Sequence, residues 1–336
     1  MWSISAPTIA ARRAFSLIEL LVTVGLVGLL LAIVLPSIQA ARSAARKTHC
    51  QNNLRQLAIA AQAFHSAFDH FPAGFQQRAF PNPPVYRGTS LFARLLPHLD
   101  EENVLTSWDD IDPVQNASGG IGSRTAIVLP VLLCPDDLLE SNPVVRGQWY
   151  YALTSYGGNG GSRTLDPAGA TVDGIFHTTG EVSEPKPNQR PVRVAQIADG
   201  TSHTVLFGER SHADSNYQAF VDQGWAESLH SWGWWGACGG RKSIGHVTLA
   251  SEAPLNYRVE YSYSDAADLP APFRSAAEFQ SIVNRRLSSF GSGHSAGANF
   301  AYADASVRYV SNGIVADILR AMCTRNGSES ATALDP

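Results

Sequence analysis

The stretch that decides the fold is Arg12-Arg13-Ala14-Phe15-Ser16-Leu17-Ile18-Glu19, followed by apolar residues as far as Leu35. Two arginines precede a run of about 20 mostly apolar residues, the length that one helix needs to cross a bilayer. Glu19 is the single charged residue in this run. A carboxylate in hydrocarbon costs at least about 2.5 kcal/mol unless it is paired, so its presence indicates a function.

Two plainer interpretations of this opening remain. A secretory signal peptide has an apolar stretch of about 7–15 residues and a small-residue cleavage site. The run here is longer and contains a charge, although Ser43-Ala44-Ala45 offers a weak cleavage site. An ordinary single-span anchor leaves Glu19 without a role. Basic residues lie on both sides of the span, so charge alone does not fix its orientation.

The composition is that of a folded chain with an acidic body. The 336 residues, 44% of them hydrophobic, suffice for a membrane helix plus one large or two small globular units. Residues 1–50 carry five basic residues and one acidic residue, which leaves 20 basic and 28 acidic residues for the remainder. Nucleic-acid binding requires a basic face, so the body is not expected to bind nucleic acid.

The four cysteines are widely spaced, at positions Cys50, Cys134, Cys238 and Cys323. No C-x-x-C pair is present, and this spacing argues against a structural zinc site. An exported body would be expected to form one or two disulfides, and four cysteines allow three pairings.

One long helix is predicted from about Phe15 to about His70. Pro36 should kink this helix rather than end it, and Phe71-Pro72-Ala73-Gly74 is a stop signal. Apolar residues recur at spacings of three and four in its second half, which predicts a single buried face. These residues are Leu54, Leu57, Ala61, Phe64, Phe68 and Phe71.

Residues 71–336, the head, are predicted to be rich in strands, with Gly/Pro loops and a few short helices. Ser90 is expected to cap a short helix, Asp199-Gly200 to form a hairpin-type turn, and 157–161 to be a glycine-rich turn. Strands are expected at 131–134, 204–207 and 259–264, a hairpin around Asp304-Ala305, and a last helix from about Ile314. The predicted fold class is α+β: a pilin-like lollipop, with a membrane-spanning helix packed on a mainly antiparallel head.

Phe15-Ser16-Leu17-Ile18-Glu19 resembles the prepilin processing signal of type IV pilins and type II secretion pseudopilins. The resemblance implies that a prepilin peptidase cuts between Ala14 and Phe15 and that the new Phe15 amine is methylated. It also implies that Glu19 pairs with this amine on a neighbouring subunit. Ala14 stands where the family usually has Gly. The expected parts are a leader (1–14), a transmembrane and assembly half of the helix containing Pro36 (15–37), an amphipathic half (38–70) and the head (71–336).

Landmarks farther along resemble proteins with a prepilin-type start and a body called domain of unknown function 1559. They are Cys50-Gln51-Asn52-Asn53-Leu54-Arg55-Gln56-Leu57, Phe71-Pro72-Ala73-Gly74, Leu133-Cys134-Pro135, Asp173-Gly174-Ile175-Phe176, Asp199-Gly200-Thr201-Ser202-His203-Thr204 and the segment from His294 to Val310. Because Cys50 and Cys134 both fall in these landmarks, the resemblance favours a disulfide between them. It also marks Asp199, His203, His294 and Asp304 as a candidate family motif. Ala305 replaces the usual Gly after Asp304.

Three patterns resemble chemical sites. Gly293-His294-Ser295-Ala296-Gly297 matches a hydrolase nucleophile elbow, but His294 is the last histidine and the triad order requires one after the serine. Asp199, His203 and Glu209 form a conceivable metal or acid–base set, for which a polar turn is the plainer interpretation. Aspartates in loops, Asp109, Asp110, Asp112, Asp136 and Asp137, are oxygen donors suited to Ca²⁺, but without EF-hand spacing.

Four of the seven tryptophans lie within eleven residues, at Trp225, Trp232, Trp234 and Trp235. Exposed, this cluster would be a candidate binding patch for sugars or protein. Buried, it would be a small core under long loops, and the sequence favours this interpretation.

The sequence therefore leads to two function hypotheses and no enzyme or required cofactor, with Ca²⁺ a lesser possibility. The first is a structural pseudopilin-like subunit of a pilus- or type II secretion-like filament, with prepilin peptidase and related pseudopilins as partners. The alternative is a membrane-tethered binding module for polysaccharide or protein that does not polymerise. Both imply a single-pass inner-membrane protein with its head in the periplasm or at the cell surface.

Overall fold

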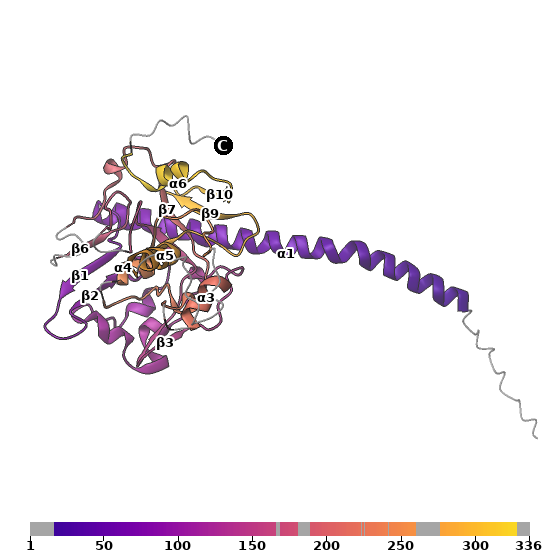
Figure 1. The fold of residues 1–336 in the computed structure, drawn as a ribbon, viewed down its shortest axis with the longest axis horizontal. Coiled ribbons are helices and arrows are strands. Elements are labelled where there is room, and N and C mark those ends of the chain that lie inside the picture. Colours follow the sequence, from indigo (N-terminus) through magenta and orange to yellow (C-terminus); the bar gives the residue numbers. More distant parts are fainter. Residues whose placement is uncertain are drawn as a thin grey trace, which may run out of the picture. The chain divides into compact units, whose positions relative to one another are not determined.

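The computed structural model describes residues 17–165, 169–180, 189–222, 224, 226–240, 242–259 and 276–327. The chain divides into two units, Met1–Arg46 and Lys47–Pro336. Helix α1 (Leu17–Phe68) begins in the first unit and ends in the second (Figure 1). Ala14, Phe15 and Trp225 lie outside the described residues, as does most of the strand expected at 259–264.

The first unit contains the apolar half of α1, whose side chains from Leu17 to Ile38 are exposed. An 18-residue window of this helix has a mean hydropathy of 2.7. Among the described residues, α1 is the one helix long and apolar enough to cross a membrane. The helix continues through Pro36, as predicted. Its composition indicates a membrane anchor or a signal sequence.

The second half of α1 buries one face, as its apolar periodicity predicts. The buried residues are Cys50, Asn53, Leu54, Leu57, Ala58, Ala60, Ala61 and Phe64. Leu54 and Leu57 share a core with Leu206 and Phe207 of the head, and full burial of each such side chain contributes about 2 kcal/mol. Phe68 does not belong to the buried face: it is 55% exposed, because α1 ends there and Asp69 turns the chain with a left-handed φ of 60°.

The central sheet of the head has five strands in the order β10-β9-β7-β5-β8. Their bounds are β5 (Tyr156–Asn159), β7 (Val205–Glu209), β8 (Thr248–Leu249), β9 (Gly297–Tyr302) and β10 (Val307–Ser311). Strand β7 runs antiparallel to β9 and β5, and β8 runs parallel to β5. The β9–β10 hairpin around Asp304-Ala305 and the strand at 204–207 confirm the sequence-based predictions.

Gly157 and Gly158 lie inside strand β5 and not in the turn that was predicted. A Cβ atom on Gly157 would lie 2.6 Å from Leu249, and one on Gly158 would lie 2.5 Å from Leu91 and from Phe176. Glycine is therefore needed here for close packing of side chains on both faces of the sheet.

Two smaller sheets and several short helices complete the head (Figure 1). The sheets are β2-β1-β6, with β1 (Phe75–Ala79), β2 (Tyr86–Ser90) and β6 (Thr178–Gly180), and β3-β4, with β3 (Val144–Arg146) and β4 (Trp149–Tyr151). The helices are α2 (Leu91–Leu95), α3 (Ser215–Asp222), α4 (Ser243–Val247), α5 (Ala276–Ser288) and α6 (Ala316–Cys323). The 3-10 helices are η1 (Leu96–His98), η2 (Glu102–Leu105), η3 (Pro113–Ala117), η4 (Gly120–Gly122), η5 (Arg124–Ala126), η6 (Pro130–Leu132), η7 (Val194–Gln196) and η8 (Leu229–Ser231).

Two of these elements had been predicted from local sequence signals, one correctly and one wrongly. Ser90 caps α2 as predicted, because its hydroxyl accepts a hydrogen bond from the Ala93 amide. The strand expected at 131–134 is wrong: the 3-10 helix η6 covers Pro130–Leu132. Proline at the first position of η6 has the φ that such a turn needs and no N–H to offer a strand partner.

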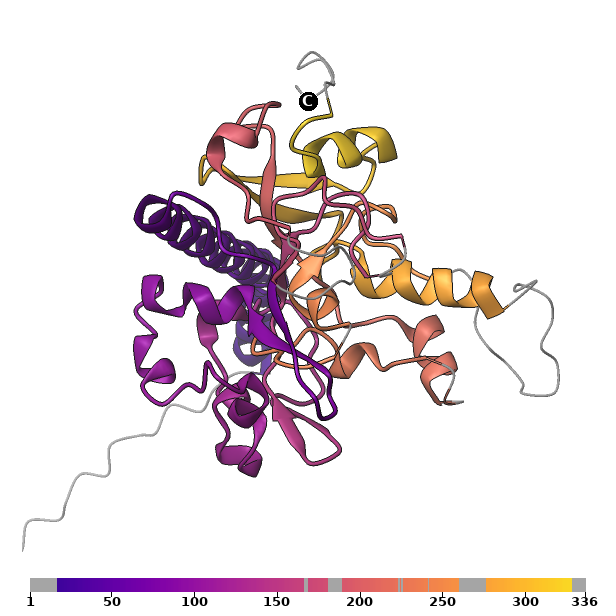
Figure 2. The ribbon, with the colours of Figure 1, turned by 90° about the vertical axis from the view of Figure 1, so that its left-hand side faces the viewer.

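The C-terminal helix α6 lies beside residues 194–204 in both views (Figures 1 and 2). The Ala198 amide donates to the Arg325 carbonyl at 2.8 Å. Nearby, Ala305 adopts the left-handed conformation with φ 64° in the β9–β10 turn. A non-glycine residue accepts about 1–2 kcal/mol of strain there.

Candidate functional site

Of the residues that the sequence predicts to act in processing and assembly, the described part of the chain contains Glu19 and Pro36, both within α1. Glu19 is the third described residue of α1. The neighbouring Ile18 and Leu20 are more than half exposed. The chain thus places one carboxylate at the start of an otherwise apolar helical surface.

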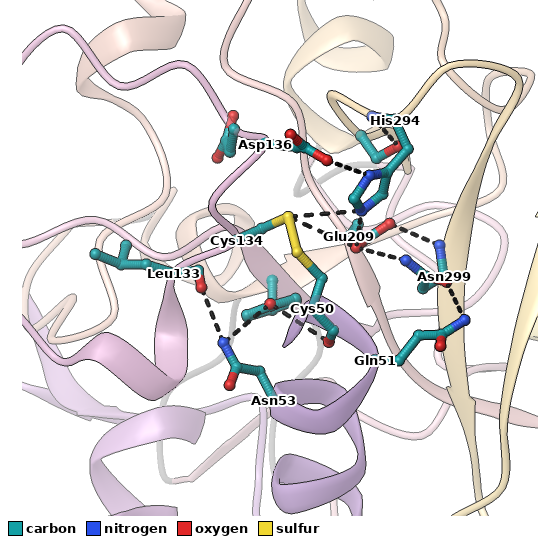
Figure 3. The surroundings of a disulfide bond; sticks show 12 residues. Cys50, Gln51, Asn53, Leu133, Cys134, Asp136, Glu209, His294 and Asn299 are labelled. Atoms are coloured by element: carbon teal, nitrogen blue, oxygen red, sulfur yellow. Dashed lines mark hydrogen bonds and ion pairs between the residues drawn. A yellow bond between two sulfur atoms is a disulfide. The ribbon is translucent and has the colours of Figure 1, made fainter. Parts of the chain in front are cut away.

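A disulfide connects the buried face of α1 to the head. Cys50 of α1 is bonded to Cys134, which follows η6, with the two Cα atoms 5.1 Å apart (Figure 3). This confirms the pairing favoured by the family resemblance. Cys238 and Cys323 are buried free thiols, and burial raises the pKa of Cys238 to about 12.

Two polar side chains that follow Cys50 in α1 strengthen this connection. Asn53 donates from Nδ2 to the Leu133 carbonyl at 2.9 Å. Gln51 donates from Nε2 to Oδ1 of Asn299 in β9 at 3.0 Å. The helix is therefore held to the head by one covalent bond and by hydrogen bonds to two separate segments (Figure 3).

Glu209, the last residue of β7, is the buried carboxylate at the centre of this site. Its Oε2 accepts a hydrogen bond from the Asn299 amide N–H at 2.6 Å. Its Oε1 accepts one from Asn299 Nδ2 at 2.9 Å and lies 3.2 Å from His294 Nε2. A buried carboxylate needs such partners, and here the neighbouring strand β9 supplies most of them.

His294 lies between two carboxylates and beside the disulfide (Figure 3). Its Nδ1 is 2.7 Å from Asp136 Oδ2, and its Nε2 is 3.7 Å from Cys134 Sγ. Burial lowers the pKa of His294, but the hydrogen bonds and charges of Glu209 and Asp136 outweigh burial and raise this pKa above its usual value. The protonated imidazole donates to both carboxylates and offsets part of their charge.

Two successive aspartates after the disulfide each pair with a histidine. Asp136 pairs with His294, and Asp137 pairs with His212, whose Nδ1 lies 2.6 Å from Asp137 Oδ2. Burial alone raises the pKa of Asp137, but the charge and hydrogen bonds of His212 lower this pKa overall. These pairs fix the segment after Cys134.

A cavity of about 640 Å³ lies next to this cluster and is lined by Asp136 and His294. Ser292, Asn256, Arg258 and Asn312 also line it. His294 is 9% exposed, whereas Glu209 behind it is fully buried. The His294–Asp136 pair is therefore the part of the cluster that lies nearest to solvent.

The candidate family motif separates into two places. The Asp304 amide donates to the Thr201 carbonyl at 3.1 Å, which joins the turn at 199–204 to the β9–β10 turn. His294 lies before the other end of β9, about 20 Å away for a six-residue strand. Asp199 and His203 are likewise separated from Glu209 by the length of β7, so these three do not form a metal or acid–base set.

The turn at Asp199-Gly200 follows the 3-10 helix η7 and not a strand, so it is not a hairpin turn. Asp199 Oδ2 accepts a hydrogen bond from the Gly327 amide at 2.8 Å. His203 Nδ1 lies 3.3 Å from Ser202 Oγ. Asp304 Oδ1 accepts from the Ser306 amide in its own turn. These polar groups support turns.

The described members of the tryptophan cluster do not form an exposed binding patch. Trp232 and Trp235 are at most 3% exposed. Trp234 is half-buried and stacks on Tyr151 and on His246, with ring centroids 4.1 and 3.8 Å apart. The aromatic area of the three described tryptophans is used within the head, as the core interpretation predicts.

The other candidate patterns have local roles. Asp109 Oδ1 accepts from the backbone amides of Ile111 and Asp112. Asp112 pairs with Arg87 at 2.6 Å, and Asp110 with Arg94 at 3.3 Å. Residues 293–296 form a loop that leads into strand β9. A nucleophile elbow would instead lead into a helix.

Sequence reasoning missed the roles of Glu209 and Asp136 at the disulfide. Asp136 lies two residues after Cys134, which was a usable signal once the disulfide was predicted. Glu209 gave no such signal, because its partners lie 75 to 90 residues away in the chain.

A family model described as "Protein of unknown function (DUF1559)" matches residues 39–316. No curated protein and no solved structure matches the chain. The matched range includes Cys50, Cys134, Glu209 and His294. The chain therefore belongs to the DUF1559 family of proteins of unknown function.

Proposed function

We propose that this protein is a pseudopilin-like structural subunit that assembles through helix α1 into a pilus- or type II secretion-like filament. The observation that carries the proposal is the first half of α1. Its apolar side chains from Leu17 to Ile38 are exposed, and Glu19 is the one carboxylate among them. A helix that is apolar all round needs lipid or other helices around it.

Glu19 gives this helix a directional contact. In a low-dielectric surrounding a carboxylate is costly unless a cation neutralises it. After cleavage between Ala14 and Phe15, the new α-amine of Phe15 lies four residues before Glu19 in every subunit. Pairing of Glu19 with the Phe15 amine of a neighbouring subunit would fix the axial position of each helix against the next.

The disulfide junction suits the head to such an assembly. Cys50 lies on the same continuous helix as Glu19 and is bonded to Cys134 of the head. Force applied to α1 during assembly or extrusion would reach the head through this bond and through Gln51 and Asn53. A disulfide also suits a head that is exported to an oxidising compartment.

The proposal includes the cellular setting. Prepilin peptidase would remove residues 1–14, and related pseudopilins would be the assembly partners. The protein would be a single-pass inner-membrane protein, with the head in the periplasm or at the cell surface. The head would act as a non-catalytic structural part.

The test replaces Glu19 with leucine in the full chain. Glu19→Leu is expected to insert into the membrane and to form the Cys50–Cys134 disulfide, yet to lose filaments and cross-linked multimers. Thr23→Leu is the matched control, since Thr23 bonds to the Leu20 carbonyl of its own helix, and it should assemble like the wild type. Normal filaments from Glu19→Leu would refute the pairing.

A further inference from the structure

Four potential metal ligands meet where α1 joins the head. They are Cys50, Cys134, Glu209 and His294, and one ligand atom from each lies within 4.8 Å of all the others. All four side chains are buried and come from separate segments of the chain. The wide spacing of the cysteines in sequence argued against zinc, but folding brings two of them together with a carboxylate and an imidazole (Figure 3).

The distances already approach those of a tetrahedral zinc site. Zinc bonds of about 2.0–2.3 Å place neighbouring ligand atoms about 3.3–3.8 Å apart. Cys134 Sγ is 3.7 Å from His294 Nε2 and 3.8 Å from Glu209 Oε1, and these last two atoms are 3.2 Å apart. The Cys50 sulfur lies within 4.8 Å of the other ligand atoms, and the two sulfur atoms have to separate, which follows when their bond is reduced.

The surrounding groups orient the ligands as zinc sites require. A histidine that binds zinc through one nitrogen usually donates from the other to a carboxylate, and His294 Nδ1 lies 2.7 Å from Asp136. Glu209 is held by two hydrogen bonds from Asn299. The cavity lined by His294 and Asp136 gives an ion a route from solvent.

We infer that the reduced protein binds one Zn²⁺ through Cys50, Cys134, Glu209 and His294. The disulfide and the metal ion would then be alternative ways to connect α1 to the head. A phosphine reductant and one water supply two electrons and two protons to the disulfide, and the phosphine becomes its oxide. Zinc then binds both thiolates, the Glu209 carboxylate and neutral His294 Nε2, with release of the two thiol protons and the imidazolium proton. The inference concerns the head junction and does not depend on filament assembly.

The experiment measures zinc on the full chain in detergent. Oxidised protein and protein reduced anaerobically with a phosphine are each treated with chelator, desalted, loaded with ZnSO₄ and desalted again. We expect one zinc per reduced chain and none per oxidised chain. Co²⁺ in place of zinc should give the sulfur-to-cobalt charge-transfer bands of thiolate ligands. Equal zinc in both redox states, no zinc in the reduced state, or cobalt without these bands would each overturn the inference.

Variants identify the ligands. Cys50→Ser and His294→Ala should lose stoichiometric zinc, and Asp136→Asn should weaken zinc binding by about 10–100-fold as a positioning residue. Cys238→Ser is the matched control, because this buried free thiol lies outside the cluster, and it should keep the site. Loss of zinc in Cys238→Ser with retention in Cys50→Ser would overturn the assignment.

Cysteine alkylation of the wild-type chain tests the same ligands without variants, which could fail to fold. Zinc should slow alkylation of Cys50 and Cys134 in the reduced wild type at least tenfold, as read by peptide mass spectrometry. The Cys238 thiol should alkylate at the same rate with and without zinc. Alkylation of Cys50 and Cys134 at an unchanged rate would overturn the proposed ligand set.

Discussion

Glu209 is buried at the end of β7 with Asn299 and His294 as its partners. Glu209→Gln keeps the shape but removes the negative charge beside His294 and turns an amide N–H₂ toward donors of Asn299. Breaking a buried charged pair costs about 3–5 kcal/mol. We expect a loss of about 3 kcal/mol in the free energy of unfolding, measured by urea denaturation of the oxidised full chain in detergent.

The control for this substitution is Glu227→Gln. Glu227 forms a 2.8 Å pair with Lys242, and both side chains are about one-third exposed or more. Exposed pairs contribute about 0–1 kcal/mol, so this variant should unfold close to the wild type. Equal effects of the two substitutions would show that Glu209 is not the centre of the buried network.

His294 gives the stability of the head a pH dependence. Its pKa in the folded protein is raised by Glu209 and Asp136 despite the opposing effect of burial. The folded state therefore holds the His294 proton more tightly than the unfolded chain. The resulting stabilisation is fully present below the unfolded pKa of about 6.5 and is lost as the pH rises through the folded pKa.

We therefore expect oxidised wild type to lose more stability between about pH 6 and pH 9 than His294→Gln does. Urea denaturation across this range measures the difference. His49→Gln is the control, since His49 is an exposed histidine on the same helix as Cys50, and it should follow the wild-type profile. Parallel profiles for wild type and His294→Gln would contradict the assigned shift.

At the scale of elements, the disulfide joins α1 to the segment after η6 across a sequence separation of 84 residues. Cross-linking a loop of this length stabilises the folded state by about 4 kcal/mol through the entropy of the unfolded chain. The double variant Cys50→Ala/Cys134→Ala should lose about this amount in urea denaturation. The control Cys238→Ala removes a buried thiol without removing a cross-link, and its free energy of unfolding should fall by about 1 kcal/mol. A similar loss in the double variant and in the control would contradict the stabilising role of the disulfide.

Elements with strong local signals were predicted from the sequence. Helix α1, the cap at Ser90, the β9–β10 hairpin and α6 each follow from periodicity or from capping chemistry. One error falls where distant side chains decide the conformation. Gly157 and Gly158 lie in a strand because Leu249, Leu91 and Phe176 pack against them, which no local pattern reveals.

At the scale of the whole molecule, sequence reasoning predicted the α+β class, the apolar helix and the Cys50–Cys134 pair. It did not predict the cluster around Glu209, because four separate segments supply its members. The motif residues Asp199 and Asp304 do not lie next to this cluster. Strands β7 and β9 separate them from it, because both residues lie at the opposite end of the sheet. The family landmarks therefore predicted the order of these residues along the chain, but not which of them lie close together in the fold.

The central claim is that this chain is processed and assembled like a pseudopilin. Mass spectrometry of the N-terminus of the protein from its native membrane tests it most directly. The account predicts a mature chain that begins at N-methylated Phe15. An intact Met1, or a chain that begins near Ala45 after removal of a signal peptide, would contradict it.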